Sequence, residues 1–203
     1  MSGGARLLLI TDGSPVQLRA LTAALGVLPR GGALVQLRAK GLPARELLER
    51  AQHALGPCVR AGAPLLVNDR ADVAHALGAA GVHLPGGGLP VQEARYLLGP
   101  AALIGVSCHS PEEVALASRA GADYALFSPV FAVPGKGPPQ GLAGLALAVR
   151  AAPLPVFALG GIDASNALAC MEAGARGVAC LRSVFGAADP AAAAIAVWQA
   201  ATA

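Results

Sequence analysis

The sequence is poor in charged residues and has no membrane-length apolar run. Only 13% of its 203 residues are charged, against 55% that are hydrophobic. The most apolar stretch, Ala191–Val197, is too short to span a bilayer and leads into Trp198-Gln199, as in a packed terminal helix. The amino terminus lacks a signal-peptide pattern, because Leu7–Ile10 runs directly into Thr11-Asp12. We therefore expect a cytoplasmic protein with no membrane partner.

Several other signals are missing. The four cysteines show no paired spacing, which argues against a zinc site and against a disulfide framework. The net charge of +3 is too small and too scattered to indicate nucleic-acid binding. No G-x-G-x-x-G motif follows the first predicted strand, which weakens a dinucleotide-binding interpretation.

Lysine is also scarce. Of the 15 basic residues only Lys40 and Lys136 are lysine. Both follow predicted strands, and we take both as catalytic candidates.

Apolar strand segments alternate with helical segments along the whole chain. Three helix-to-strand joins repeat one pattern, a small-residue helix end, a glycine and a hydrophobic strand, which favours a parallel sheet with right-handed crossovers. Eight such units predict an α/β fold of the (β/α)₈ TIM-barrel class, with residues 1–203 as one domain. The strands are expected at residues 6–10, 33–37, 64–67, 81–84, 102–106, 124–127, 156–159 and 177–181. Gly56-Pro57 should end the second helix, and Arg182-Ser183 should lead into one final helix.

Polar residues gather where these strands end, the usual place for a site in this fold. They are Gln36, Arg38, Lys40, Asn68, Asp69, His83, Ser107, His109, Ser128, Lys136, Arg182 and Ser183. Arg38 and Lys40 sit at alternate positions, which favours an anionic, phosphorylated ligand over a solvated strand exit. Gly160-Gly161 and Arg182-Ser183 form either a phosphate cradle or two ordinary turns, and the arginine favours the cradle.

Three of these residues remain open to two interpretations. Asp69 could bind Mg²⁺ or cap the third helix. His109 is an acid–base candidate by pKa range, or a structural group near a helix start. His83 is better interpreted as a packed histidine at a strand end than as a base.

Six segments carry a family resemblance, in order along nearly the whole chain: VQLRAK (35–40), VNDR-D-A (67–74), GVHLP (81–85), GVSCHSPEE (105–113), GADYALFSPVF (121–131) and ALGGI (158–162). They resemble the thiamine phosphate synthase/TenI superfamily. The resemblance implies a barrel that binds a small phosphorylated thiazole. It implies one of two activities, joining a pyrimidine diphosphate to thiazole phosphate with Mg²⁺, or aromatising a carboxythiazole phosphate by proton transfer.

The resemblance also implies roles for particular residues. Gln36 resembles the glutamine that contacts the pyrimidine, and Asp69 resembles the first magnesium ligand. Gly160 and Gly161 resemble the thiazole-phosphate cradle. The residues that resemble the family's diphosphate ligands are Arg38, Lys40, Ser107 and Lys136.

Two departures from the family pattern bear on the activity. Gly88 stands where synthases have a second magnesium carboxylate, and Pro129 stands where a TenI-type tautomerase has its catalytic histidine. The missing carboxylate favours a TenI-like thiazole tautomerase that requires no cofactor. The alternatives are a thiamine phosphate synthase with Mg²⁺, and a non-catalytic thiazole-phosphate binding or regulatory protein. The apolar, arginine-studded exterior would permit a homodimer.

Overall fold

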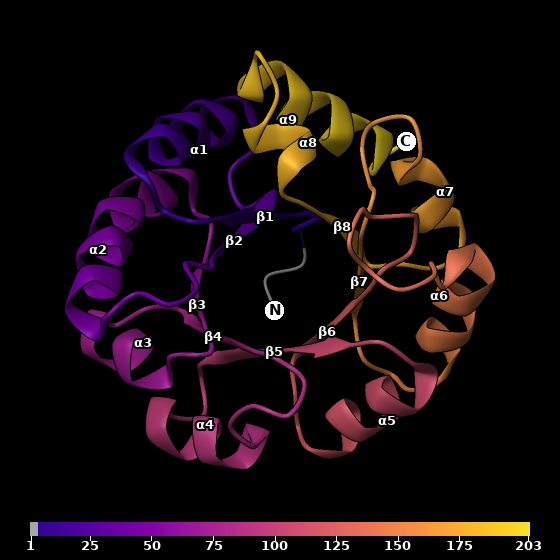
Figure 1. Cartoon of the computed structure of the whole chain (residues 1–203), viewed down its shortest axis with the longest axis horizontal. Coiled ribbons are helices and arrows are strands. Elements are labelled where there is room, and N and C mark those ends of the chain that lie inside the picture. Colours follow the sequence, from indigo (N-terminus) through magenta and orange to yellow (C-terminus); the bar gives the residue numbers. More distant parts are fainter. Residues whose placement is uncertain (1–3) are drawn as a thin grey trace.

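The computed structural model describes residues 4–203 and contains a closed barrel of parallel strands (Figure 1). Each strand pairs with the next in sequence order, and β8 closes the ring against β1. This confirms the predicted (β/α)₈ barrel. The strands are β1 Leu7–Thr11, β2 Ala33–Leu37, β3 Leu65–Asn68, β4 Gly81–Leu84, β5 Leu103–Cys108, β6 Tyr124–Phe127, β7 Val156–Leu159 and β8 Gly177–Cys180.

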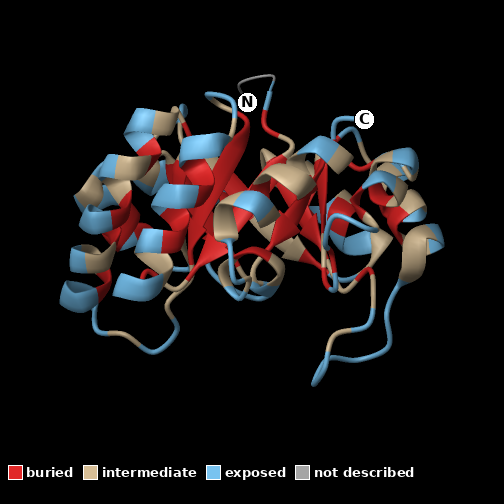
Figure 2. Ribbon diagram, turned by 90° about the horizontal axis from the view of Figure 1, so that it is seen from above, coloured by how far each residue is buried: buried red, intermediate tan, exposed pale blue. Residues whose placement is uncertain are grey.

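The helices surround the barrel and bury its outer face (Figures 1 and 2). They are α1 Pro15–Val27, α2 Ala44–Ala61, α3 Ala71–Leu77, α4 Val91–Leu98, α5 Pro111–Arg119, α6 Gly141–Arg150, α7 Ala167–Glu172, α8 Arg182–Phe185 and α9 Pro190–Ala200. No helix within the described range 4–203 is both long enough and apolar enough to cross a membrane.

The core has two layers because successive side chains of a strand point to opposite faces of the sheet. One set fills the space between strands and helices. The other fills the barrel interior and includes Leu8, Leu34, Leu66, Tyr124 and Phe157. Polar side chains replace these apolar ones toward the carboxyl ends of the strands, where Gln36 follows Leu34 and Asn68 follows Leu66 on the inward face. The alternation thus places the polar groups in the mouth of the barrel.

Two predicted helix boundaries are wrong. Helix α2 continues through Pro57 to Ala61, and Gly62, whose backbone is left-handed, caps it through its amide. Proline removes one hydrogen bond from a helix interior. The buried face of α2, which includes Ala54 and Cys58, packs on both sides of that point, and this packing outweighs the local signal. The chain after β8 also forms two helices rather than one, the single turn α8 and then α9.

The four cysteines are buried and free. Burial raises the pKa of Cys58 and of Cys108 to about 12, which keeps both as thiols.

Candidate active site

A cavity of about 1010 Å³ opens at the carboxyl ends of the strands. Its apolar floor includes Ile10, Leu126 and Leu159, which lie toward the carboxyl ends of their strands. Most of the predicted site residues line it: Gln36, Arg38, Ser107, His109, Ser128, Lys136, Gly160, Gly161, Arg182 and Ser183. The structure therefore brings residues that lie far apart in the sequence, from Gln36 to Ser183, together in one cavity. Lys40, Asn68 and Asp69 lie outside this wall.

Strand β2 supplies a buried amide and a cation from its inward face. Gln36 is 1% exposed, and its Nε2 donates to the Oδ1 of Asn68 on β3 at 2.9 Å. Its Oε1 has no hydrogen-bond partner within residues 4–203. A buried oxygen without a hydrogen-bond donor costs free energy, and a ligand N–H that donates to Oε1 would recover that cost. Asn68 thus contributes by orienting Gln36 rather than by lining the cavity.

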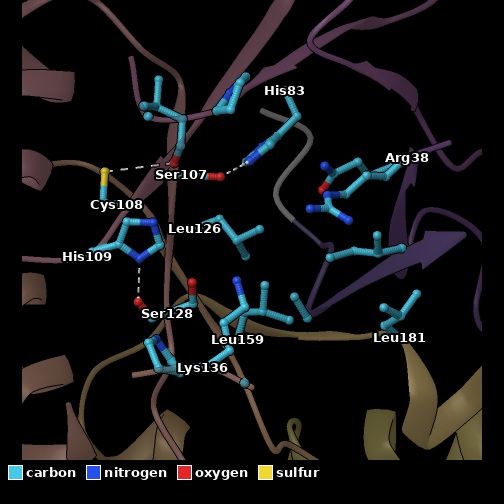
Figure 3. A pocket seen from close by; sticks show the side chains of 18 of the residues that line it. Arg38, His83, Ser107, Cys108, His109, Leu126, Ser128, Lys136, Leu159 and Leu181 are labelled. Carbon is cyan, nitrogen blue, oxygen red and sulfur yellow. Dashed lines mark hydrogen bonds between the residues drawn. The ribbon is translucent and has the colours of Figure 1, made fainter. Parts of the chain in front are cut away.

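Three cations line the cavity with no carboxylate partner in the described part of the chain. Arg38 follows β2, Lys136 lies in the loop between β6 and α6, and Arg182 begins α8. The ion pairs within residues 4–203 are Arg50–Glu46, Arg70–Asp72 and Arg95–Asp123, all elsewhere on the barrel. Figure 3 shows Arg38 and Lys136 on opposite sides of the cavity. Unpaired cations in a cleft attract an anion, and the guanidinium suits the paired oxygens of a phosphate.

His83 is the packed strand residue that the sequence suggested, and the structure gives it two polar partners. Its side chain is fully buried, with Nδ1 3.0 Å from the Tyr124 hydroxyl and Nε2 2.9 Å from Ser107 Oγ. Burial, aided by the positive charge of Arg38, lowers the pKa of His83 to about 3. The imidazole is therefore neutral at physiological pH. The sequence does not predict this hydrogen-bonding role for Tyr124, because a tyrosine within an apolar strand segment has the pattern of a core residue.

His109 is held in one orientation at the rim. Its ring Nδ1 donates to the carbonyl oxygen of Ser128 at 2.7 Å, since a carbonyl can only accept. Its backbone amide donates to Oε2 of Glu113 at 2.6 Å. When the ring is neutral, its proton on Nδ1 leaves Nε2 as a proton acceptor, and Nε2 has no hydrogen-bond partner within residues 4–203. His109 lines the cavity (Figure 3). This geometry suits a general base.

Gly160 and Gly161 form the turn after β7, with positive φ values of 105° and 65°. A Cβ on Gly161 would lie 2.9 Å from the carbonyl oxygen of Ala132, in the loop that crosses this turn. The pair is therefore required by close backbone packing as well as by any phosphate. Within the described range, the amides of Gly161 and Ile162 donate to no protein acceptor. Such amides beside Arg182 fit the predicted anion cradle.

The predicted metal ligand stands apart at the rim. Asp69 directly follows β3, is exposed and has a φ of 68°, an uncommon backbone conformation for a residue other than glycine. Arg70 occupies the N-cap position before α3, so Asp69 is not the cap of that helix. Residues 4–203 contain no cluster of three or more Asp, Glu, His or Cys side chains that could hold a metal ion. Gly88 lies in the turn after β4, next to the cavity-lining Gly87.

The cavity also has two carboxylates that the sequence did not single out, Glu113 and Asp163. Both are engaged locally. Glu113 accepts from the His109 amide, and Asp163 accepts from the amide and the hydroxyl of Ser165. Only the folded loops bring them to the rim.

Unpaired cations and a glycine turn at the carboxyl-terminal mouth of a (β/α)₈ barrel are typical of the barrels that keep a phosphate-binding site at this face. The family model described as thiamine monophosphate synthase matches residues 7–184, and the chain belongs to this family. The protein acts in thiamine biosynthesis.

Two curated relatives show how close the match is. A thiamine-phosphate synthase of Roseiflexus sp. strain RS-1 is 45% identical over 197 residues, which cover 95% of this chain and 83% of that protein. A putative thiamine-phosphate synthase of Geobacter sulfurreducens is 46% identical over 188 residues, with 91% and 88% coverage. Thiamine phosphate pyrophosphorylase from Pyrococcus furiosus superimposes with a TM-score of 0.87 at 32% identity, covering 98% of this chain and 96% of that one. These relatives favour the synthase alternative over the TenI-like activity that Gly88 had suggested.

Proposed function

We propose that the protein is a thiamine-phosphate synthase. In this reaction the ring nitrogen of thiazole phosphate attacks the methylene carbon of a hydroxymethylpyrimidine diphosphate. The bond from that carbon to the diphosphate oxygen breaks, and its electron pair leaves with the diphosphate. The observation that carries the proposal is that one cavity is lined by cations and by unpaired amides at several places. Arg38 and Lys136 lie on opposite sides of it, and Arg182 and the glycine turn line it as well (Figure 3). Two phosphorylated substrates would use several such anion-binding groups, whereas a tautomerase substrate has a single phosphate.

The residues divide between these substrates by their chemistry. Gln36 offers an unpartnered acceptor to the amino group of the pyrimidine. Arg38, Lys136 and Ser107 line the cavity, and their positive charge and hydrogen-bond donors would stabilise the diphosphate as it leaves. The unpaired amides at Gly161 and Ile162 would receive the thiazole phosphate. Lys40, exposed after β2, could reach the diphosphate only by extending over the rim.

Mg²⁺ is the metal that this reaction calls for, because it neutralises the charge that develops on a departing diphosphate. Mg²⁺ is commonly bound through one or two carboxylates together with substrate phosphates. A single rim carboxylate, Asp69, fits that pattern if the diphosphate supplies further oxygen ligands. Gly88 contributes none, so the proposed synthase would depend more on its substrate for metal binding than one with two carboxylates.

The test is direct. The purified protein is mixed with the pyrimidine diphosphate, thiazole phosphate and Mg²⁺, and thiamine phosphate is measured by chromatography. We expect turnover that needs Mg²⁺, with kcat in the ordinary range of about 1 s⁻¹ or more. Binding of both substrates without product would exclude the synthase and support the non-catalytic binding protein.

One observation favours a second candidate, the TenI-like tautomerase that needs no metal. His109 presents its Nε2 to the cavity as a proton acceptor, and a proton shift on the thiazole requires such a base. Incubation with the carboxythiazole phosphate tautomer in the absence of Mg²⁺ tests it. Aromatisation that is lost in His109→Ala would support the tautomerase, and unchanged rates in that variant would exclude His109 as its base.

A further inference from the structure

Three polar side chains from neighbouring strands form a hydrogen-bonded chain inside the barrel. Tyr124 on β6 lies at one end, His83 on β4 in the middle and Ser107 on β5 at the other end. Tyr124 and His83 are fully buried, and His83 and Ser107 both line the wall of the cavity, whereas Tyr124 does not. Figure 3 shows the His83–Ser107 hydrogen bond at the cavity wall. The chain thus connects the closed interior with the candidate diphosphate region.

The strand register explains how Tyr124 reaches His83 across an intervening strand. Gly105 on β5 pairs with His83 on one side and with Tyr124 on the other. A Cβ on Gly105 would overlap the ring of Tyr124. The missing side chain therefore leaves the space through which the phenol meets the imidazole.

The burial of Tyr124 decides where the proton of His83 lies. His83 Nδ1 is the hydroxyl's hydrogen-bond partner within residues 4–203. Burial, reinforced by the negative charge of Asp123, raises the pKa of Tyr124, so the hydroxyl keeps its proton. If Nδ1 carried the imidazole proton, the Tyr124 hydroxyl would have no protein acceptor, a substantial cost inside the barrel. The hydroxyl therefore donates to Nδ1, and the single proton of the neutral imidazole must be on Nε2.

This arrangement fixes the direction of the bond to Ser107. His83 Nε2–H donates to Oγ, so the serine hydroxyl proton is free to point into the cavity. A serine 2.9 Å from a histidine is also the spacing of a nucleophile and its base. Here the nitrogen nearest the serine carries a proton and cannot accept one. Ser107 is thereby made a donor rather than a nucleophile.

We propose that Tyr124 and His83 are positioning residues that orient Ser107 to donate a hydrogen bond to an anionic oxygen, the diphosphate of the substrate. The choice of ligand rests on the proposed function. With the opposite polarity, the Ser107 proton would point at His83 and only its lone pairs would face the anion. This chain of hydrogen bonds from Tyr124 through His83 to Ser107, the relay, therefore determines whether Ser107 offers the diphosphate a proton or a lone pair.

The first test reads the tautomer itself. Long-range ¹H–¹⁵N correlation spectra of the ¹⁵N-labelled full chain distinguish a protonated from an unprotonated ring nitrogen, and the His83→Gln variant identifies the His83 signals. We expect Nε2 protonated and Nδ1 unprotonated. In Tyr124→Phe, we expect the Nδ1-protonated tautomer to gain population. A wild-type protein with the proton on Nδ1 would overturn the proposal.

The second test is a double-mutant cycle on affinity for inorganic diphosphate, measured by titration calorimetry. Ser107→Ala should weaken binding about tenfold, as for loss of a hydrogen bond to a charged group. Tyr124→Phe should weaken it about threefold to tenfold alone, but add little in the Ser107→Ala background. The other tyrosine, Tyr96, is 90% exposed, so Tyr96→Phe is the matched control and should bind normally. Melting temperatures measured alongside separate any loss of folded protein from loss of affinity.

These outcomes distinguish the relay from the reaction. Additive losses of Tyr124→Phe and Ser107→Ala, in a protein that does make thiamine phosphate, would refute the relay and retain the synthase. The expected tautomer and non-additive cycle, in a protein that makes none, would refute the synthase and retain the relay. Failure of the wild-type chain to bind diphosphate would refute both the ligand assignment and the relay's role.

Discussion

Replacement of Arg38 by glutamine removes the guanidinium that faces the cavity from the end of β2. Arg38 has no ion-pair partner within residues 4–203, so its charge is available to a ligand. It is also close enough to His83 to contribute, after burial, to the lowered pKa of that imidazole. Arg38→Gln should therefore weaken diphosphate binding and raise the pKa of His83. Burial remains as the larger cause, so His83 should stay neutral at pH 7.

The size of the first effect follows from the kind of contact. A hydrogen bond to a charged group contributes about 1.5–3 kcal/mol, which corresponds to roughly 10- to 150-fold in affinity. The variant leaves no unpaired carboxylate behind, because the arginine has no acidic partner. The fold should therefore be retained.

The assay is calorimetric titration with inorganic diphosphate, followed by kcat/KM for thiamine phosphate formation. Arg19→Gln is the matched control, since it makes the same change in net charge at an exposed position on α1, outside the cavity. Long-range attraction that is screened by salt would fall equally in both variants. Equal losses in Arg38→Gln and Arg19→Gln would refute the assignment of Arg38 to the anion site.

Three further predictions follow from single residues. His83 has a pKa of about 3 when folded and about 6.5 when unfolded, so the unfolded chain binds the extra proton between these values. Its contribution to stability is complete above pH 6.5 and should fall by about 1.4 kcal/mol per pH unit toward pH 3 in urea unfolding, a slope that His83→Gln should reduce. Gly161→Ala should lower the free energy of unfolding by about 1–3 kcal/mol, because its φ is positive and its Cβ would meet the carbonyl oxygen of Ala132. Gly137→Ala, in the loop between β6 and α6, has open space around its Cβ and should change the free energy of unfolding little. Asp69→Asn should raise the Mg²⁺ concentration for half-maximal synthase activity by about tenfold without altering metal-free diphosphate binding, and an unchanged Mg²⁺ requirement would remove Asp69 as a ligand.

The alternation of elements could be predicted because it depends on local chemistry. Strands buried on both faces read as short continuous apolar runs, and four-residue segments such as Tyr124–Phe127 and Val156–Leu159 were placed at their observed bounds. Ser110 stands before Pro111 at the start of α5, and its Oγ accepts from the amide of Glu113, a local cap that depends on residues three positions apart. Since parallel strands all end at the same mouth, the gathering of polar residues in one cavity followed from the fold class alone.

Tertiary packing decided what local signals could not. Pro57 remains inside α2 because the buried face of that helix packs on the barrel beyond it. Gly161 is required by the loop that crosses it as much as by any ligand. The link from Tyr124 through His83 to Ser107 joins residues up to 41 positions apart, and it exists only because barrel closure sets the register that aligns His83, Gly105 and Tyr124. The sequence by itself determined which groups reach the mouth of the barrel. The cross-strand register determined which of them touch, and therefore how their protons are arranged.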